Sequence, residues 1–136
     1  MKLLLLASAG GAIGAGARYL VNQAFVRNLS GADVAAGMPV FPWATMTVNV
    51  VGGFLMGLLV VVIGQRLGGA PEWRTFLTTG ILGGFTTFSA FSLDMFTLVS
   101  HDGVVGPKFL FYVFGSVLLA FMALLAGFWV ARTVLV

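Results

Sequence analysis

Hydrophobic residues are gathered along this chain into four long runs, and a short polar or Gly/Pro-containing stretch separates each run from the next. A helix that crosses a bilayer needs about 20 predominantly apolar residues, and each run is long enough to supply them. The pattern therefore predicts four transmembrane helices, over approximately residues 3–25, 43–63, 74–99 and 108–130. We expect a single transmembrane domain of the all-α membrane class over residues 1–136.

The third run differs from the others because glycine and hydroxyl residues cluster at its centre, in the stretch GILGGFTTFSAFS at residues 80–92. From residue 75 to residue 99 the one charged side chain is that of Asp94. Backbone groups at membrane depth must be paired within the protein, so a helix break there survives only where it lines a cavity or binds something. Breaks of this kind mark ion or substrate sites in transporters. We therefore expect the third helix to be broken at the bilayer midplane, around residues 83–86.

Small residues recur four positions apart in the first two runs. The spacings are Ala7/Gly11, Gly10/Gly14 and Gly11/Ala15 in the first run and Gly53/Gly57 in the second. Small residues at this spacing let two helices approach closely in lipid, where no hydrophobic force drives them together. Both helices are therefore expected to pack tightly against neighbours.

The composition agrees with a membrane protein and argues against several kinds of function. Hydrophobic residues make up 60% of the chain and charged residues 8%, far from the averages of soluble proteins. The chain has no cysteine and one histidine, so disulfides, thiolate metal sites and imidazole catalysis are not expected, and neither is an enzyme. The net charge is +3, but the basic residues are scattered singly and form no stripe that would bind nucleic acid.

The basic residues are nearly balanced between the two ends of the predicted bundle. The face that carries both termini has Lys2, Arg66, Arg74 and Arg132, and the opposite face has Arg18, Arg27 and Lys108. A membrane protein is oriented by an excess of Lys and Arg on one side, and this chain has almost none. We therefore expect dual topology, with two oppositely inserted copies forming an antiparallel homodimer about an axis in the membrane plane.

An antiparallel dimer would bring the two midplane breaks together near its axis. Unwound carbonyl groups from both chains would then point toward a shared position, and oxygens without donors call for a cation. Because no carboxylate is nearby, a weakly held monovalent ion such as Na⁺ fits this position better than Ca²⁺.

Two polar side chains on the predicted helices each allow two interpretations. Asn49 either makes a hydrogen bond between helices or presents its two N–H donors to an anion. Arg18 either extends to the membrane boundary beside Tyr19 or places a fixed positive charge at the mouth of a water-filled vestibule. The sequence does not decide between them.

Aromatic and hydroxyl side chains form two ridges along the end of the third run. Their members are Phe85, Phe88 and Phe91 in one ridge and Thr86, Ser89 and Ser92 in the other. The aromatic ridge is either ordinary packing or, because phenyl edges carry positive partial charge, the lining of a path for a small, strongly hydrated anion. Tyr112 and Ser116, one turn apart on the fourth helix, add two hydroxyl groups. Neutral donors bind an ion weakly enough for it to leave, as conduction requires.

Three motifs of this chain resemble the signatures of the Fluc (CrcB) family of bacterial fluoride channels. They are GxxGAxxRY at residues 11–19, TxxxNxxGxFxxG at residues 45–57 and GxxGGxTTFSxFS at residues 80–92. The resemblance implies a passive, fluoride-selective channel in the bacterial inner membrane that exports fluoride and relieves its toxicity. It also implies an antiparallel homodimer with two pores and a central structural Na⁺, surrounded by membrane lipid.

The resemblance further implies roles for individual residues. Asn49 would be a pore-lining donor, Phe88 and Phe91 a box of ring edges, and Thr45 and Ser89 parts of a polar track, with Arg18 belonging to the first motif and the fluoride pathway. Tyr112 and Ser116 match the family's pair on the fourth helix, and the carbonyls of Gly83 and Thr86 match its Na⁺ site. Two departures concern the polar track, because Ala44 replaces a usual Gly and Ala90 a usual Thr.

Two other functions remain as alternatives. A small dual-topology, proton-coupled exporter of organic cations needs an ionisable carboxylate near mid-membrane, whereas Asp94 lies roughly 11 Å from the centre of its predicted helix. A structural membrane subunit without a transport role would explain the glycine spacing but not the clustered donors or the midplane break.

Overall fold

The computed structural model describes residues 1–27, 41–103 and 105–135, and within these ranges the chain is helical with short connections. Three membrane-length helices are continuous: α1 (Lys2–Arg27), α3 (Trp43–Gln65) and α7 (Pro107–Leu135). Between α3 and α7 the third span is built from four consecutive pieces: α4 (Pro71–Arg74), the π-helix η1 (Thr75–Leu82), α5 (Gly83–Phe85) and α6 (Phe88–Asp102).

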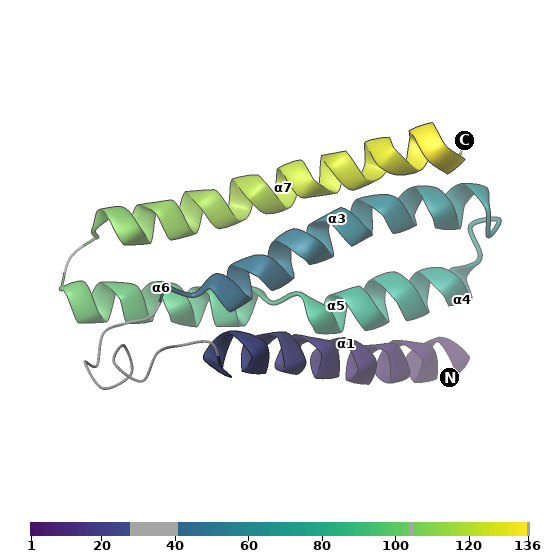
Figure 1. The fold of residues 1–136 in the computed structure, drawn as a ribbon. Helices are drawn as coiled ribbons and strands as arrows, with labels where there is room; N and C mark the ends of the chain where they lie inside the picture. The colour runs from purple at the N-terminus through teal and green to yellow at the C-terminus, as the bar shows by residue number, and fades with distance from the viewer. Residues whose placement is uncertain (28–40, 104, 136) are drawn as a thin grey trace.

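The four expected spans are present. Four helical segments are long and apolar enough to cross a membrane, at Lys2–Arg27, Trp43–Gln65, Pro71–Ser100 and Pro107–Val134. Each begins within a few residues of the start that hydrophobicity predicted, so the prediction of four transmembrane helices is confirmed. Both termini lie at the same end of the bundle, as an even number of spans requires (Figure 1).

The helices associate in two closely packed pairs. In Figure 1, α1 runs along η1 and α5 at one side of the bundle and α3 runs along α7 at the other. A Cβ atom on Gly10 of α1 would lie 2.5 Å from the carbonyl oxygen of Phe76, and one on Gly53 of α3 would lie 2.5 Å from that of Ala120. Both glycines are therefore required by the close approach of two backbones, which confirms the packing expected from the small-residue spacing.

The third span is interrupted, but not at its glycine pair. Thr86 (φ −75°, ψ 159°) and Thr87 (φ −153°, ψ 124°) are extended, whereas Gly83 (φ −64°, ψ −36°) is helical. The break expected around residues 83–86 is therefore present, but at the end of this range, because Thr86 belongs to it and the two glycines do not. Gly84 is needed for another reason, because a Cβ there would lie 2.5 Å from the carbonyl oxygen of Gly11 on α1.

The eight residues before the glycine pair form the π-helix η1. Helices of this type are rare and occur mostly as single turns, frequently at functional sites. The hydrophobic pattern of the third run did not predict this π-helix. The third span therefore changes its winding, ends its first half at Phe85, and starts again at Phe88.

A small buried core lies between α3, α6 and α7 on one side of the break. Its fully buried members are Met46, Phe91, Leu98 and Tyr112. Large apolar side chains elsewhere, including Phe114 and Trp129 of α7, are exposed on the single chain, as is usual for helices that face lipid. The core therefore stabilises the second half of the third span against α3 and α7.

Candidate ion-pathway site

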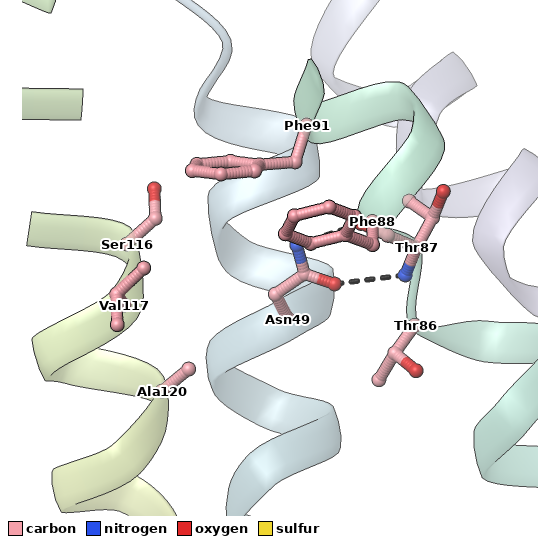
Figure 2. Close-up of a pocket in the computed structure, with 8 residues that line it drawn as sticks. All are labelled: Asn49, Thr86, Thr87, Phe88, Phe91, Ser116, Val117 and Ala120. Carbon is pink, nitrogen blue, oxygen red and sulfur yellow. Dashed lines mark hydrogen bonds between the residues drawn. The ribbon is translucent and has the colours of Figure 1, made fainter. Parts of the chain in front are cut away.

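The break frees the backbone N–H of Thr87, and Asn49 binds both this N–H and the carbonyl oxygen of the same residue. In an unbroken helix the N–H of Thr87 would donate to the carbonyl of Gly83. Here it donates to Asn49 Oδ1 at 2.9 Å, and Asn49 Nδ2 donates to the carbonyl oxygen of Thr87 at 3.1 Å. Figure 2 shows the Asn49 side chain reaching from α3 to the extended segment, with the first of these bonds dashed. One side-chain amide thus binds both backbone polar groups of Thr87, its N–H and its carbonyl.

Thr87 also begins the second half of the span. Its hydroxyl oxygen accepts a hydrogen bond from the N–H of Ala90 at 3.1 Å, the usual arrangement of an N-cap threonine. The hydroxyl of Ser89 lies 3.3 Å from the same oxygen. Because Thr87 is buried, these bonds are sheltered and define where α6 starts.

The carbonyl group of the preceding residue has a partner from α1. Arg18 Nη1 donates to the carbonyl oxygen of Thr86 at 3.3 Å. The Thr86 N–H and hydroxyl both donate to the carbonyl oxygen of Leu82 at 2.9 Å. The guanidinium group therefore reaches the interruption itself rather than extending away from it. Without Arg18 the balance of boundary charges becomes four to two.

A cavity of about 300 Å³ opens beside the break, between α3, α6 and α7. It is lined by Asn49, Thr86, Thr87, Phe88, Phe91, Ser116, Val117 and Ala120. In Figure 2 the residues of α7 stand on one side of this space, and Asn49 and the two phenyl rings stand on the other. Within the described part of the chain no carboxylate lines the cavity, so its polar groups are neutral.

Ser116 places a hydroxyl group in this cavity without a partner. Its side chain is 3% exposed, and its Oγ atom has no hydrogen-bond partner among the residues that the structure describes. Buried hydroxyl groups are nearly always hydrogen-bonded, so one that lines a cavity without a partner indicates a ligand or water at that position. Ser116 therefore offers an O–H donor to whatever enters.

The two phenylalanines at the cavity differ sharply in exposure. Phe88 is 77% exposed and Phe91 is 6% exposed, although their ring centroids are 5.7 Å apart with the planes tilted by 40°. Phe91 packs in turn against the ring of Tyr112, with centroids 5.1 Å apart. Phe91 is thus fixed by the core, whereas most of the Phe88 side chain is exposed on the single chain.

A second polar cluster lies behind Phe91. The hydroxyl of Tyr112 is buried and donates to Asp94 Oδ2 at 2.8 Å. Thr45 and Asp94 both line a separate cavity of about 340 Å³, together with Asn22 of α1. Phe91 and Tyr112 therefore stand between a neutral cavity at the break and a cavity that contains a carboxylate.

The structure brings together about half of the residues that the sequence singled out. Asn49, Thr86, Phe88, Phe91 and Ser116 line the cavity at the break. The others lie outside it: Thr45 in the second cavity, Tyr112 behind Phe91, Ser89 exposed beside Thr87, Arg18 at the Thr86 carbonyl, and Gly83 exposed in the helical segment before the break.

Sequence reasoning missed Thr87, which is the centre of the hydrogen-bond network. Threonine is a preferred N-cap residue, and Thr87 stands directly before the second apolar half of the third span. This signal could have identified it as an N-cap. Val117 and Ala120, which complete the α7 wall, have no chemical signal, since both are ordinary residues of an apolar helix.

Comparison with known proteins gives consistent matches. A family model described as "CrcB-like protein, Camphor Resistance (CrcB)" matches residues 5–128. The chain is 47% identical over 130 residues to the protein named fluoride-specific ion channel FluC in Mesorhizobium japonicum, covering 96% of each chain. It is 46% identical over 127 residues to the protein of that name in Rhizobium meliloti, covering 93% of this chain and 94% of the other. In Caulobacter vibrioides the identity is 47% over 135 residues, with 98% of each chain covered.

Proposed function

Because the chain belongs to the CrcB-like protein family, we propose that it is a fluoride-specific ion channel that carries fluoride passively out of the cell. The observation that carries this proposal is the neutral cavity at the break, with the unpartnered hydroxyl of Ser116 opposite the amide of Asn49. An ion channel is not an enzyme, and the cavity contains no acid–base pair that would suggest one.

The chemistry of the lining suits a small anion. Asn49 Nδ2 has two hydrogens, and one of them is used by the Thr87 carbonyl, so the second remains for a ligand. The Ser116 hydroxyl and the positive edges of Phe88 and Phe91 supply further donors. None of these groups carries a full charge, so the anion is bound weakly enough to move on.

Flux measurements in liposomes test the proposal. Vesicles that contain the purified protein are loaded with KF or KCl, and valinomycin is added to release the potassium counter-ion. We expect rapid fluoride efflux and no comparable chloride efflux, without any dependence on a proton gradient. Chloride efflux at a similar rate would refute fluoride selectivity, and flux that requires a proton gradient would support an exporter instead.

We also propose that the working unit is an antiparallel, dual-topology homodimer in the bacterial inner membrane. The exposed ring of Phe88 beside an open cavity supports it, because a second copy would cover this ring and narrow the space. The distribution of basic residues gives weaker support. Once Arg18 is left out, four lie on the face with the termini and two on the opposite face, so the two faces are less evenly balanced than the sequence suggested.

Topology is tested by single cysteines in this cysteine-free chain. Gln65, the last residue of α3, and Val105, in the connection before α7, are suitable positions, because both are exposed and lie at opposite ends of the bundle. Gly68 is less suitable because its φ of 60° disfavours a side chain. Each cysteine should be labelled partly from outside intact cells. If one is labelled completely from outside and the other not at all, the protein has a single orientation.

A Na⁺ ion bound by the carbonyls of Gly83 and Thr86 is the last part of the proposal. The Thr87 N–H that would pair with the Gly83 carbonyl in a continuous helix is bound to Asn49 instead, which favours a role for this carbonyl as a ligand. Thr86 keeps a second lone pair beside its bond to Arg18. Carbonyl oxygens fit a hard monovalent cation, and two from each chain would give four at the dimer axis. A Na⁺-dependent dimer melting temperature would support the site, whereas equal melting in Na⁺ and N-methylglucamine would refute it.

A further inference from the structure

Arg18 is a charged side chain at the depth of the break. It lies nine residues before Arg27, the last residue of α1, which is about 14 Å along the helix. Its partner Thr86 lies 15 residues after Pro71 and 14 before Ser100, and so at the middle of the third span. A charge at such depth is costly unless it faces water or binds backbone carbonyls. Its hydrogen bond to the Thr86 carbonyl therefore marks a specific role.

The interruption is bound from two sides by side chains of two different helices. Arg18 of α1 binds the carbonyl of Thr86, and Asn49 of α3 binds the N–H and carbonyl of Thr87. α1 packs mainly on η1 and α5, whereas α3 packs mainly on α7. Polar contacts at Thr86 and Thr87 thus join the pair formed by α1 with η1 and α5 to the pair formed by α3 with α7.

The charge of Arg18 also counters the electrostatics of the helix end. The carbonyl end of a helix carries a partial negative charge, and here η1 and α5 end at Thr86, which lines the cavity. A negative potential at this point would oppose entry of an anion. A guanidinium group bound to the Thr86 carbonyl offsets that potential from outside the cavity, so it does not bind the passing ion itself.

We propose that Arg18 is a positioning residue, which holds the Thr86 carbonyl and thereby fixes the direction in which the chain enters α6. Its effect on conduction rests on the proposed function, but its effect on the break does not. Arg27 provides a matched control, because it is an exposed arginine on the same helix, at the end remote from the break.

Hydrogen exchange of the full-length protein in lipid nanodiscs measures the break directly. Arg18→Met should raise exchange at the Thr87 and Ala90 amides about tenfold or more, the effect expected for loss of a charge-assisted hydrogen bond. Arg18→Lys keeps a cationic donor and should restore exchange close to wild type. Arg27→Met should leave these two amides unchanged. If Arg18→Met does not fold, Arg18→Gln provides the same comparison, since its side chain is too short to reach Thr86.

Fluoride flux per folded protein gives the second readout. It should fall for Arg18→Met, recover for Arg18→Lys, and stay near wild type for Arg27→Met. Unchanged exchange in Arg18→Met would overturn the proposal even if flux fell, because the residue would then act only through its charge on the ion. Equal increases in Arg18→Met and Arg27→Met would overturn it as well. If the wild-type protein conducts no fluoride, the proposed function fails, and the exchange experiment still decides the role of Arg18.

Discussion

The two halves of the third span contact their neighbours in opposite ways. The first half, η1 and α5, meets α1 through its backbone, and a Cβ atom on Gly80 would lie 2.9 Å from the Cα atom of Gly10. The second half, α6, meets α3 and α7 through side chains, with Phe91 packed on Tyr112 and the open cavity beside them. The face of the first half that meets α1 therefore has no room for added atoms, whereas the second half has room for an ion.

Because of this difference, substitutions only a few residues apart should affect different properties of the protein. A larger side chain on the face of the first half that meets α1 pushes two helices apart and acts on stability. In the second half, a change alters the lining of the cavity and acts mainly on conduction. Between them, Thr86 and Thr87 belong to both halves, and a change to their partners should affect stability and conduction together.

The largest effect is expected for Asn49→Leu, which removes the partner of both polar groups of Thr87. An unpaired buried polar group costs about 1–3 kcal/mol, and this variant leaves the Thr87 N–H unpaired, whereas the Thr87 carbonyl, as that of the N-cap residue, still accepts the first hydrogen bond of α6. Thermal unfolding in detergent should shift markedly downward, and fluoride flux per folded protein should fall. Asn22→Leu is the control, since Asn22 lines the second cavity and is not among the residues that line the cavity at the break. If both variants lose stability equally, Asn49 has no special relation to the break.

Gly83 and Gly84 are neighbours in the first half, but only Gly84 contacts the backbone of α1, so the two can be compared directly. Gly84→Ala places a methyl group 2.5 Å from the carbonyl oxygen of Gly11 and should destabilise the protein by about 1–3 kcal/mol. Gly83→Ala meets nothing closer than 3.6 Å and should be neutral or stabilising by up to about 1 kcal/mol, because alanine favours the helix. Denaturation midpoints of the two variants provide the measurement. Equal midpoints would contradict the backbone contact between α1 and α5.

The sequence was sufficient to predict the spans and the tight packing, because both depend on local periodicity. Apolar runs of membrane length have few alternatives in lipid, and glycines four residues apart, as at Gly53 and Gly57, have few uses other than close approach. The position of the break was harder to predict. Gly83 and Gly84 suggested a flexible backbone, yet they are helical, and the extended residues are two threonines.

The candidate site was only partly predictable, for a related reason. The family resemblance implied that Asn49, Phe88, Phe91 and Ser116 belong to one pathway, and the structure places these four around one cavity. The partner of Arg18 could not be predicted, because Thr86 is 68 residues away and no local pattern connects them. The sequence left two interpretations of this arginine open, at the membrane boundary or at the mouth of a vestibule, and neither included a bond to a freed backbone carbonyl.

Within the second half, the two phenylalanines provide a test of the ring-edge hypothesis. Phe91 is buried and Phe88 is exposed, so Phe91→Ile should cost about 1 kcal/mol of packing and Phe88→Ile almost nothing in the single chain. If the ring edges contact fluoride, both variants should lose flux by up to about tenfold per folded dimer, because isoleucine has no positive edge. If both variants keep near-wild-type flux per folded dimer, the two phenyl rings act only in packing and the ring-edge hypothesis is wrong.

The smallest change in stability, with the opposite sign, is expected for Ser116→Ala. Because the Ser116 hydroxyl is buried without a partner among the described residues, removing it should leave stability unchanged or raise it by up to about 1 kcal/mol. If the hydroxyl instead stabilised the fold, Ser116→Ala would lower the stability of the protein. If it serves the ion, fluoride flux should fall while the melting temperature holds or rises. Thr97→Ala is the matched control, since Thr97 is exposed and its hydroxyl donates to the carbonyl of Leu93 within α6. A loss of stability in Ser116→Ala with unchanged flux would assign this hydroxyl to structure rather than to conduction.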